Sequence, residues 1–229
     1  MSDNRTITVW RDPYGAGFNT TRAKKVVFTK GTTILVGCNG SGKTTLLQNI
    51  EDELRKADIP VFMHSPNTDL SKMIDRAMFE GNFGLVGASK SMSEGENISL
   101  VFSQSFDAIR NFIATGKKPN KTFKIFSEPE KEITSNERWI LLDAIDSGYS
   151  IDNIVQLKTI FNRMHEDVNT HNVDLYIIAS ANTYELAQNS NCLDVMTGKN
   201  VHFDTYEEYR NFILKTQEKK EKRYKKETK

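Results

Sequence analysis

The chain has 229 residues with 31 basic and 30 acidic side chains, so its formal net charge is only +1 and overall electrostatics do not mark it as a nucleic-acid binder. Its apolar runs, such as residues 140–142 and 176–179, are far shorter than the roughly 18 residues that cross a bilayer, and the polar N-terminus predicts no signal peptide. Cys38 and Cys192 are too far apart to suggest a disulfide framework or a metal site, so we expect a cytoplasmic protein without a membrane partner.

The first half of the chain reads as alternating strands and helices. Period-2 and period-3.6 patterns predict strands at 6–11, 25–29, 32–36 and 59–64, and helices at 43–56, 70–79 and 93–115. The first two strands are expected to form an antiparallel pair at the N-terminus. The polar residues 116–137 are interpreted as a surface insertion.

The second half continues the alternation. We predict strands at 139–142 and 175–179, helices at 154–165 and 206–215, and a hairpin of 192–196 and 200–203 around the turn 197–199. Such alternation is typical of an α/β fold, in which a mostly parallel sheet carries helices on both faces.

The charge is concentrated at the C-terminus. Residues 215–229 include eight basic and three acidic side chains. We therefore divide the chain into a domain, residues 1–214, and a basic tail, residues 215–229. The tail is interpreted as either a solvated helix end or a DNA contact.

A glycine-rich motif follows the apolar strand predicted at 32–36. It matches G-x-x-x-x-G-K-[ST], with a buried strand before it and a helix after it. In this motif backbone N–H groups surround phosphate, Lys43 reaches the β- and γ-phosphates, and Thr44 coordinates Mg²⁺. The predicted nucleotide-binding residues are Gly37, Asn39, Gly40, Ser41, Gly42, Lys43, Thr44 and Thr45. The predicted cofactors are ATP and Mg²⁺.

A second Mg²⁺ anchor is predicted at Asp143. The apolar residues 139–142 deliver this carboxylate to the end of a strand, where α/β sheets bind their ligands. The alternative interpretation is an acid that merely ends a strand.

Three segments together resemble the ATP-binding-cassette (ABC) ATPases, a class of P-loop NTPases. Residues 37–47 read GCNGSGKTTLL, residues 93–96 read SEGE, and residues 142–148 read LDAIDSG. The second segment resembles the S-x-G-E signature of recombination, repair and chromosome-maintenance ATPases, here without a coiled coil. The resemblance implies an ABC-like sheet and a head-to-tail dimer, formed by two copies or with a related ATPase.

In this family the signature contacts ATP held by the other subunit. The resemblance assigns that role to Ser93, Glu94, Gly95 and Glu96. A helix N-terminus favours phosphate at such a position, although Ser93 and Glu96 also fit a simple capping box. The resemblance further assigns a D-loop, which contacts the partner, to Asp146, Ser147, Ser150 and Asp152. Solvated loop acids are the alternative.

The sequence departs from the family where a catalytic glutamate is expected. Ala144 occupies that position, and because a methyl group cannot orient water, we expect hydrolysis to be slower by roughly 10²- to 10⁴-fold. The alanine can be natural or an engineered trapping substitution. Asn182 stands where relatives present a histidine to the γ-phosphate and can substitute as a hydrogen-bond donor; an ordinary helix cap is the alternative. No glutamine stands where the family places one near Mg²⁺; Asn67 can fill that role, but a simple turn residue is the favoured interpretation. Tyr14 and Phe18 are candidates for stacking on adenine.

These observations predict a Mg²⁺-dependent ATP hydrolase, impaired by Ala144, that works as an ATP-dependent dimerisation switch. The resemblance to S-x-G-E ATPases suggests DNA repair, recombination or phage-related defence, with a separate effector or nuclease as a partner. A nucleotide-sensing module with little turnover and a transporter ATPase subunit are the alternatives.

Overall fold

The computed structural model describes residues 4–10, 23–65, 108–117, 133–147, 149–168 and 172–227. The predicted helix at 70–79 and most of that at 93–115 lie outside these residues. Strands are β1 (Asn4–Thr8), β2 (Lys25–Thr29), β3 (Gly31–Val36), β4 (Val61–His64), β5 (Glu137–Leu142), β6 (Asp174–Ser180), β7 (Asn191–Asp194) and β8 (Lys199–Val201). Helices are α1 (Lys43–Lys56), α5 (Ile151–Val168), α6 (Tyr184–Ala187) and α7 (Tyr206–Glu227), with a further helical segment at 108–115.

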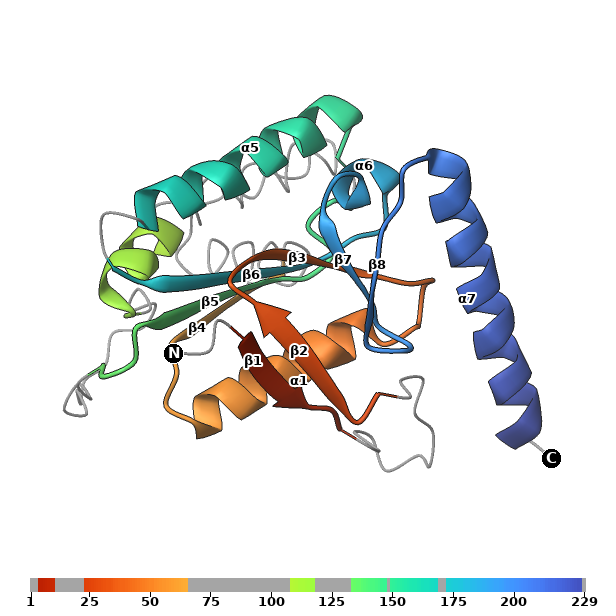
Figure 1. The fold of residues 1–229 in the computed structure, drawn as a ribbon, viewed down its shortest axis with the longest axis horizontal. Coiled ribbons are helices and arrows are strands. Elements are labelled where there is room, and N and C mark those ends of the chain that lie inside the picture. Colours follow the sequence, from red (N-terminus) through yellow and green to blue (C-terminus); the bar gives the residue numbers. More distant parts are fainter. Residues whose placement is uncertain are drawn as a thin grey trace, which may run out of the picture.

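Six strands form one sheet in the order β4-β5-β6-β3-β7-β8, in which only β8 runs antiparallel to its neighbour. Strands β1 and β2 form a separate antiparallel pair. The structure therefore confirms a mixed α/β fold with a mostly parallel sheet and an N-terminal strand pair. Figure 1 shows α5 on one side of the sheet and α1 with β1 and β2 on the other.

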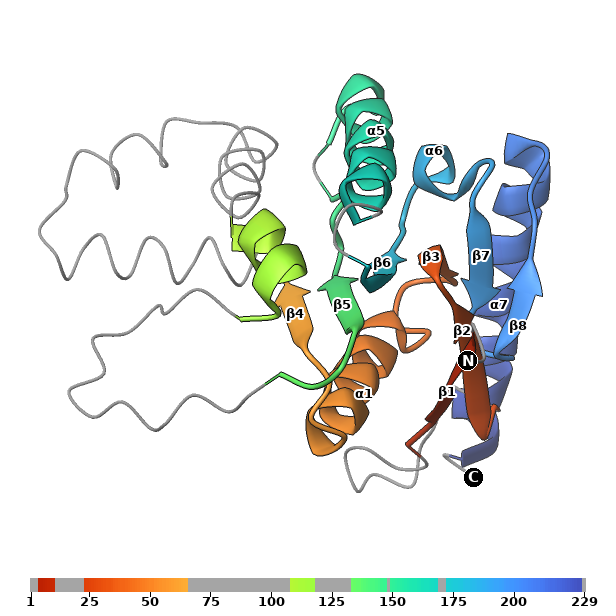
Figure 2. The same cartoon turned by 60° about the vertical axis from the view of Figure 1, so that its left-hand side comes forward.

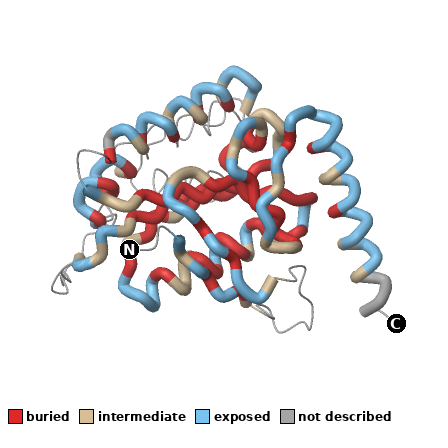
Figure 3. The backbone as a smooth tube through the Cα atoms, in the orientation of Figure 1, coloured by how far each residue is buried: buried red, intermediate tan, exposed pale blue. Residues whose placement is uncertain are grey.

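Alternate side chains of the central strands build two cores. Ile34, Ile140 and Ile177 face a cluster shared with the 108–115 helix, α5, α6 and α7. Their neighbours Leu35 and Leu141 face a second cluster, shared with α1 and the β1–β2 pair. Because side chains alternate across a strand, a sheet covered on both faces needs continuous apolar strands, as the sequence predicts. Figure 3 shows buried positions running through the central strands.

Two differences from the sequence predictions have local causes. The β7–β8 strands are shorter than expected because the Asp194 carboxylate accepts hydrogen bonds from Met196 N and Thr197 Oγ1, which closes the turn early. The last helix is longer than expected: α7 runs through residue 215 to Glu227, and no break in secondary structure marks the predicted boundary at 214 and 215. Figure 2 shows α7 as one continuous helix beside β7 and β8.

Candidate functional site

The ends of three parallel strands create the candidate site. Strand β6 lies between β5 and β3 in the sheet. Residues 37–44, here called the glycine-rich loop, follow β3, while Asp143 follows β5 and Asn182 comes shortly after β6. Parallel strands bring their carboxyl ends to one edge of the sheet, so residues distant in sequence meet there.

Two glycines of the glycine-rich loop show why the motif uses this residue. Gly42 is the N-cap of α1 with a φ of 100°, in the left-handed region. At Gly37, a Cβ atom would lie 2.6 Å from the Oγ atom of Ser41. That hydroxyl is buried, and among the described residues it has no hydrogen-bond partner. The motif glycines are thus explained by backbone geometry and close packing.

Helix α1 begins directly at this loop. Gly42 provides no side-chain cap hydrogen bond, and the first turn of α1 holds no acidic residue. The positive end of the helix dipole therefore points into the loop without a carboxylate from its own first turn to neutralise it. Such an end attracts anions, phosphate among them.

Lys43 lies folded back onto the loop. Its side chain is 9% exposed, and its Nζ donates to the carbonyl oxygens of Gly37 at 2.8 Å and Cys38 at 3.4 Å. Burial lowers the pKa of Lys43, and nearby acidic groups oppose that shift. The ammonium group is thus held beside the loop by neutral acceptors, which an anionic ligand can replace.

Thr44 and Asp143 meet across the site, as the sequence predicts for a pair of Mg²⁺ anchors. The Thr44 hydroxyl donates to both carboxylate oxygens of Asp143, at 3.1 and 2.9 Å. Two hard oxygen donors converging beside a phosphate-type loop fit Mg²⁺, which commonly takes few protein ligands and completes its shell with phosphate and water. A Mg²⁺ ion at this position would stabilise negative charge on a bound phosphate.

Ser180, at the end of β6, connects Asp143 to the next residue. Its hydroxyl donates to Asp143 Oδ1 at 3.0 Å and accepts from the backbone N–H of Ala144 at 2.6 Å. Sequence reasoning did not assign this role to Ser180. The available signal was its place at the end of a buried strand next to the one that delivers Asp143.

Ala144, which the family resemblance aligns with a catalytic glutamate, has a φ of 50°. Residues with a Cβ atom adopt this conformation at a cost of roughly 1–2 kcal/mol. The side chain is a methyl group and offers no donor, acceptor or base. In this structure the position therefore shapes the backbone between Asp143 and Asp146.

Asp146 is buried and points toward its own chain. Its Oδ2 atom accepts hydrogen bonds from Asn182 N at 2.7 Å, Thr183 N at 2.8 Å and Thr183 Oγ1 at 2.8 Å. The Asn182 side-chain amide lies 3.4 Å from both Asp146 Oδ1 and Ser147 Oγ. Through these contacts Asp146 holds the start of α6 in place. Its expected contact with a partner chain stays a prediction.

The remaining D-loop candidates lie at the start of α5. The Ser150 hydroxyl donates to an oxygen of Asp152, and this bond lowers the pKa of the exposed Asp152 carboxyl. Both side chains are exposed. Thr45 lies in the first turn of α1 and is half-buried. Ser93, Glu94, Gly95 and Glu96 lie outside the described residues, as do Tyr14, Phe18 and Asn67.

Helix α7 also contacts the glycine-rich loop, which the sequence did not predict. The backbone N–H of Cys38 donates to Thr216 Oγ1 at 3.2 Å, and Lys220 Nζ donates to the carbonyl oxygen of Asn39 at 2.6 Å. Thr216 is 1% exposed. The available signal was helical spacing, because Tyr209, Thr216 and Lys220 recur every seven or four residues on one face.

Comparisons with known proteins give little further guidance. No protein-family model matches the sequence, and no curated protein matches it either. Among solved structures, a DNA replication initiation factor is 15% identical with a TM-score of 0.27, covering 66% of this chain and 32% of that chain. Stu0660 of Streptococcus thermophilus is 13% identical with a TM-score of 0.37, covering 81% of this chain and 75% of that chain.

The chain thus spans about a third of the length of the first of these two proteins. At such low TM-scores and identities, neither similarity supports an inference about the activity of this chain. Within the part of the chain that the structure describes, no helix combines the length and the apolar character needed to cross a membrane.

Proposed function

We propose that this chain is an ABC-type P-loop ATPase that binds Mg²⁺-ATP and dimerises around it. The observation that carries the proposal is the meeting of Thr44 and Asp143, with Oγ1–Oδ distances of 2.9 and 3.1 Å, beside the buried Lys43. The glycine-rich loop, a cation and two hard oxygen donors are the protein groups that a nucleotide triphosphate with Mg²⁺ needs.

Each group has a distinct task in this proposal. The loop N–H groups and the α1 dipole hold the phosphates, and Lys43 transfers its hydrogen bonds from Gly37 and Cys38 to phosphate oxygens. Thr44 and Asp143 would hold the Mg²⁺ ion, which would supply positive charge beside the phosphates. Ser180 keeps Asp143 in place, since it already donates to that carboxylate.

The binding step is tested with Lys43→Ala. We expect ATP affinity in the presence of Mg²⁺ to fall at least 100-fold, about 3 kcal/mol, because two charge-assisted phosphate contacts are lost. Lys56→Ala is the matched control, since Lys56 lies on the same helix but is exposed and paired with Asp52. Calorimetry that finds equal ATP affinity for both variants would contradict the proposed site.

Dimerisation rests on the resemblance of residues 93–96 to the ABC signature. We expect the chain to double in mass with Mg²⁺-ATP, and Ser93→Arg to remain monomeric because its added bulk and charge block the contact. Light scattering with and without nucleotide measures this, and Lys43→Ala controls for nucleotide binding. A Ser93→Arg chain that still doubles with ATP rules out the sandwich dimer but leaves nucleotide binding intact.

Ala144 favours slow hydrolysis and, as a second candidate function, nucleotide sensing with little turnover. Its side chain cannot polarise water, so restoring a carboxylate by Ala144→Glu should accelerate single-turnover hydrolysis by roughly 10²- to 10⁴-fold. Equal rates for Ala144→Glu and the parent would show that a carboxylate at this position does not contribute to hydrolysis. The parent rate then decides between an ATPase and a sensor.

A cytoplasmic role in DNA repair, recombination or phage-related defence, with an effector or nuclease partner, is the biological setting that we propose. The transporter alternative lacks a specific supporting observation in this structure. A DNA contact by residues 215–229 is tested by salt-dependent binding with and without those residues. Absence of binding at low salt removes DNA from the proposal.

A further inference from the structure

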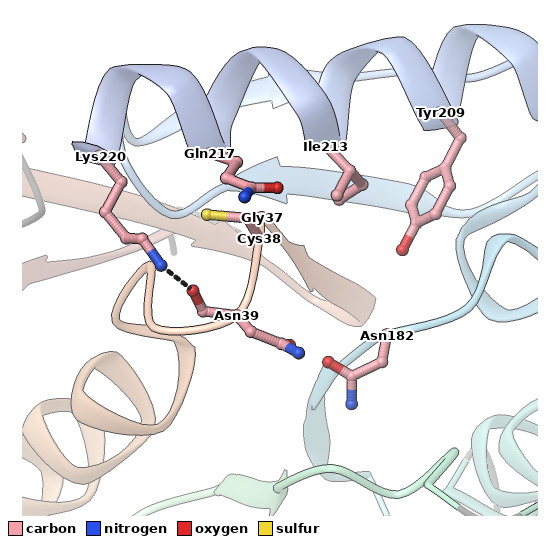
Figure 4. A pocket seen from close by; sticks show the side chains of 8 residues that line it. All are labelled: Gly37, Cys38, Asn39, Asn182, Tyr209, Ile213, Gln217 and Lys220. Carbon is pink, nitrogen blue, oxygen red and sulfur yellow. Dashed lines mark hydrogen bonds between the residues drawn. The ribbon is translucent and has the colours of Figure 1, made fainter. Parts of the chain in front are cut away.

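A cavity of about 370 Å³ is lined by residues of both the glycine-rich loop and α7. This volume falls within the range of small-ligand pockets, roughly 300–1,000 Å³. Its walls are Gly37, Cys38, Asn39, Asn182, Tyr209, Ile213, Gln217 and Lys220. Figure 4 shows the helix above the loop, with the side chains of Asn39 and Asn182 directed toward each other below it.

Two lysines share the carbonyl groups of the loop's first three residues. Lys43 donates to the carbonyls of Gly37 and Cys38, and Lys220 donates to that of Asn39. Burial is the main cause of the lowered pKa of Lys43, and the nearby positive charge of Lys220 lowers it further. Both ammonium groups therefore donate to neutral carbonyl acceptors.

Exchange of these acceptors for phosphate adds charge–charge attraction, because each ammonium group then faces an anionic oxygen instead of a neutral carbonyl. Lys43 is the lysine that reaches β- and γ-phosphates in loops of this kind. Lys220 donates to the carbonyl of Asn39, which directly follows the two carbonyls contacted by Lys43. It can therefore reach the same phosphates of a bound nucleotide.

Tyr209 indicates that the cavity is built for a polar ligand. The residue is 5% exposed, and its hydroxyl is buried without a hydrogen-bond partner among the described residues. Figure 4 shows the hydroxyl directed away from α7 and into the pocket. Buried polar groups nearly always find a partner, and the described residues supply none for this hydroxyl beside the cavity.

We propose that α7 forms a second wall of the phosphate site and that Lys220 binds the terminal phosphate of a nucleoside triphosphate. Lys220 is thereby a specificity-determining residue, which favours a triphosphate over a diphosphate. This inference rests on the proposed nucleotide-binding function. The inference goes beyond that function because it places a phosphate contact on α7, the C-terminal helix of the same chain.

The test compares a non-hydrolysable ATP analogue with ADP, both with Mg²⁺, by calorimetry on the full chain. Lys220→Met should weaken the triphosphate between about 10- and 100-fold, the loss expected for one charge-assisted bond, and ADP less than about twofold. Lys219→Met is the matched control, because the neighbouring Lys219 is exposed and is not part of the pocket wall. Lys220→Arg should restore most of the preference for the triphosphate.

Two results would overturn the inference. Equal losses for both nucleotides in Lys220→Met would mean that Lys220 only supports the loop, and unchanged binding of both would mean that it contacts no phosphate. In either case the parent chain still binds nucleotide, so the proposed function survives. A parent chain that binds neither nucleotide defeats both proposals, and circular dichroism of each variant confirms that it is folded.

Discussion

Asp143 and Asp146 follow the same strand and are both buried, yet their carboxylates accept hydrogen bonds from different kinds of donor. The Asp143 carboxylate accepts hydrogen bonds from the hydroxyls of Thr44 and Ser180. The Asp146 carboxylate instead accepts from two backbone N–H groups and the Thr183 hydroxyl. Hydroxyls can rotate and act as acceptors, so the surroundings of Asp143 can adjust to a cation. Backbone N–H groups cannot, which makes Asp146 part of the framework.

Removing the Asp146 carboxylate should have the largest effect. Asp146→Ala leaves the N–H groups of Asn182 and Thr183 without their acceptor, so we expect a loss of about 3 kcal/mol in the free energy of unfolding. Urea denaturation measures it. Asp152→Ala is the control, since it removes an exposed acid from the same predicted D-loop and should cost much less. Equal losses in the two variants would contradict a framework role for Asp146.

Neutralising Asp143 should affect ligand binding more than folding. Asp143→Asn keeps the shape of the side chain, and the Thr44 and Ser180 hydroxyls can reorient toward its amide. We expect Mg²⁺-dependent ATP affinity to fall about 10- to 100-fold, as is usual for an outer-shell metal contact. Titrations with Mg²⁺ and with chelator distinguish this role. An equal loss in chelator would show that Asp143 acts without a metal.

Ser180→Ala sharpens the comparison, because Ser180 fixes Asp143 and also accepts from the Ala144 N–H. We expect a loss of roughly 1–2 kcal/mol in unfolding free energy, together with weaker Mg²⁺-dependent ATP binding. Ser190→Ala is the control, since Ser190 donates to the backbone carbonyls of Leu186 and Gln188 and has no contact with Asp143 among the described residues. A Ser180→Ala chain as stable as the parent would argue against this bridge.

The smallest effect is expected at Ala144, the residue between the two aspartates. Ala144→Gly removes the strain of a φ of 50° but adds freedom to the unfolded chain, so we expect a net gain of about 0.5–1 kcal/mol. Thermal denaturation of the parent and variant measures it. Ala57→Gly is the control: at a φ of −89° it relieves no strain and should lose stability. A loss at both positions would show that the turn at Ala144 is unstrained.

The glycine-rich loop was predictable because its signals are local. The spacing of Gly37, Gly42 and Lys43, with an apolar strand before and an amphipathic pattern after, predicts both the loop and the helix, and the bounds of α1 agree with the sequence prediction. The position of Asp143 was predictable for the same reason, while its role as a Mg²⁺ anchor stays a prediction. An apolar strand that ends in one acid has few other interpretations beside such a loop.

The direction of Asp146 and the position of α7 were not predictable in this way. Asp146 turns inward because the N–H groups at the start of α6 lie beside it, and these belong to residues 36 and 37 positions further along the chain. The basic residues after Leu214 resemble a solvated tail by composition. The side of α7 that faces the glycine-rich loop is set by Tyr209 and Ile213, which anchor the helix in the domain core.

The hydrogen bond between Cys38 and Thr216 joins residues 178 positions apart, and this separation has a consequence for biosynthesis. Chains grow from the N-terminus at about 5–20 residues per second, so the loop leaves the ribosome roughly 10 to 35 seconds before this part of α7 does. During that interval the Cys38 amide and the Asn39 carbonyl lack their helical partners. A nascent chain therefore cannot present the two-sided pocket until translation has passed Lys220, and nucleotide captured earlier would meet only the wall built around α1.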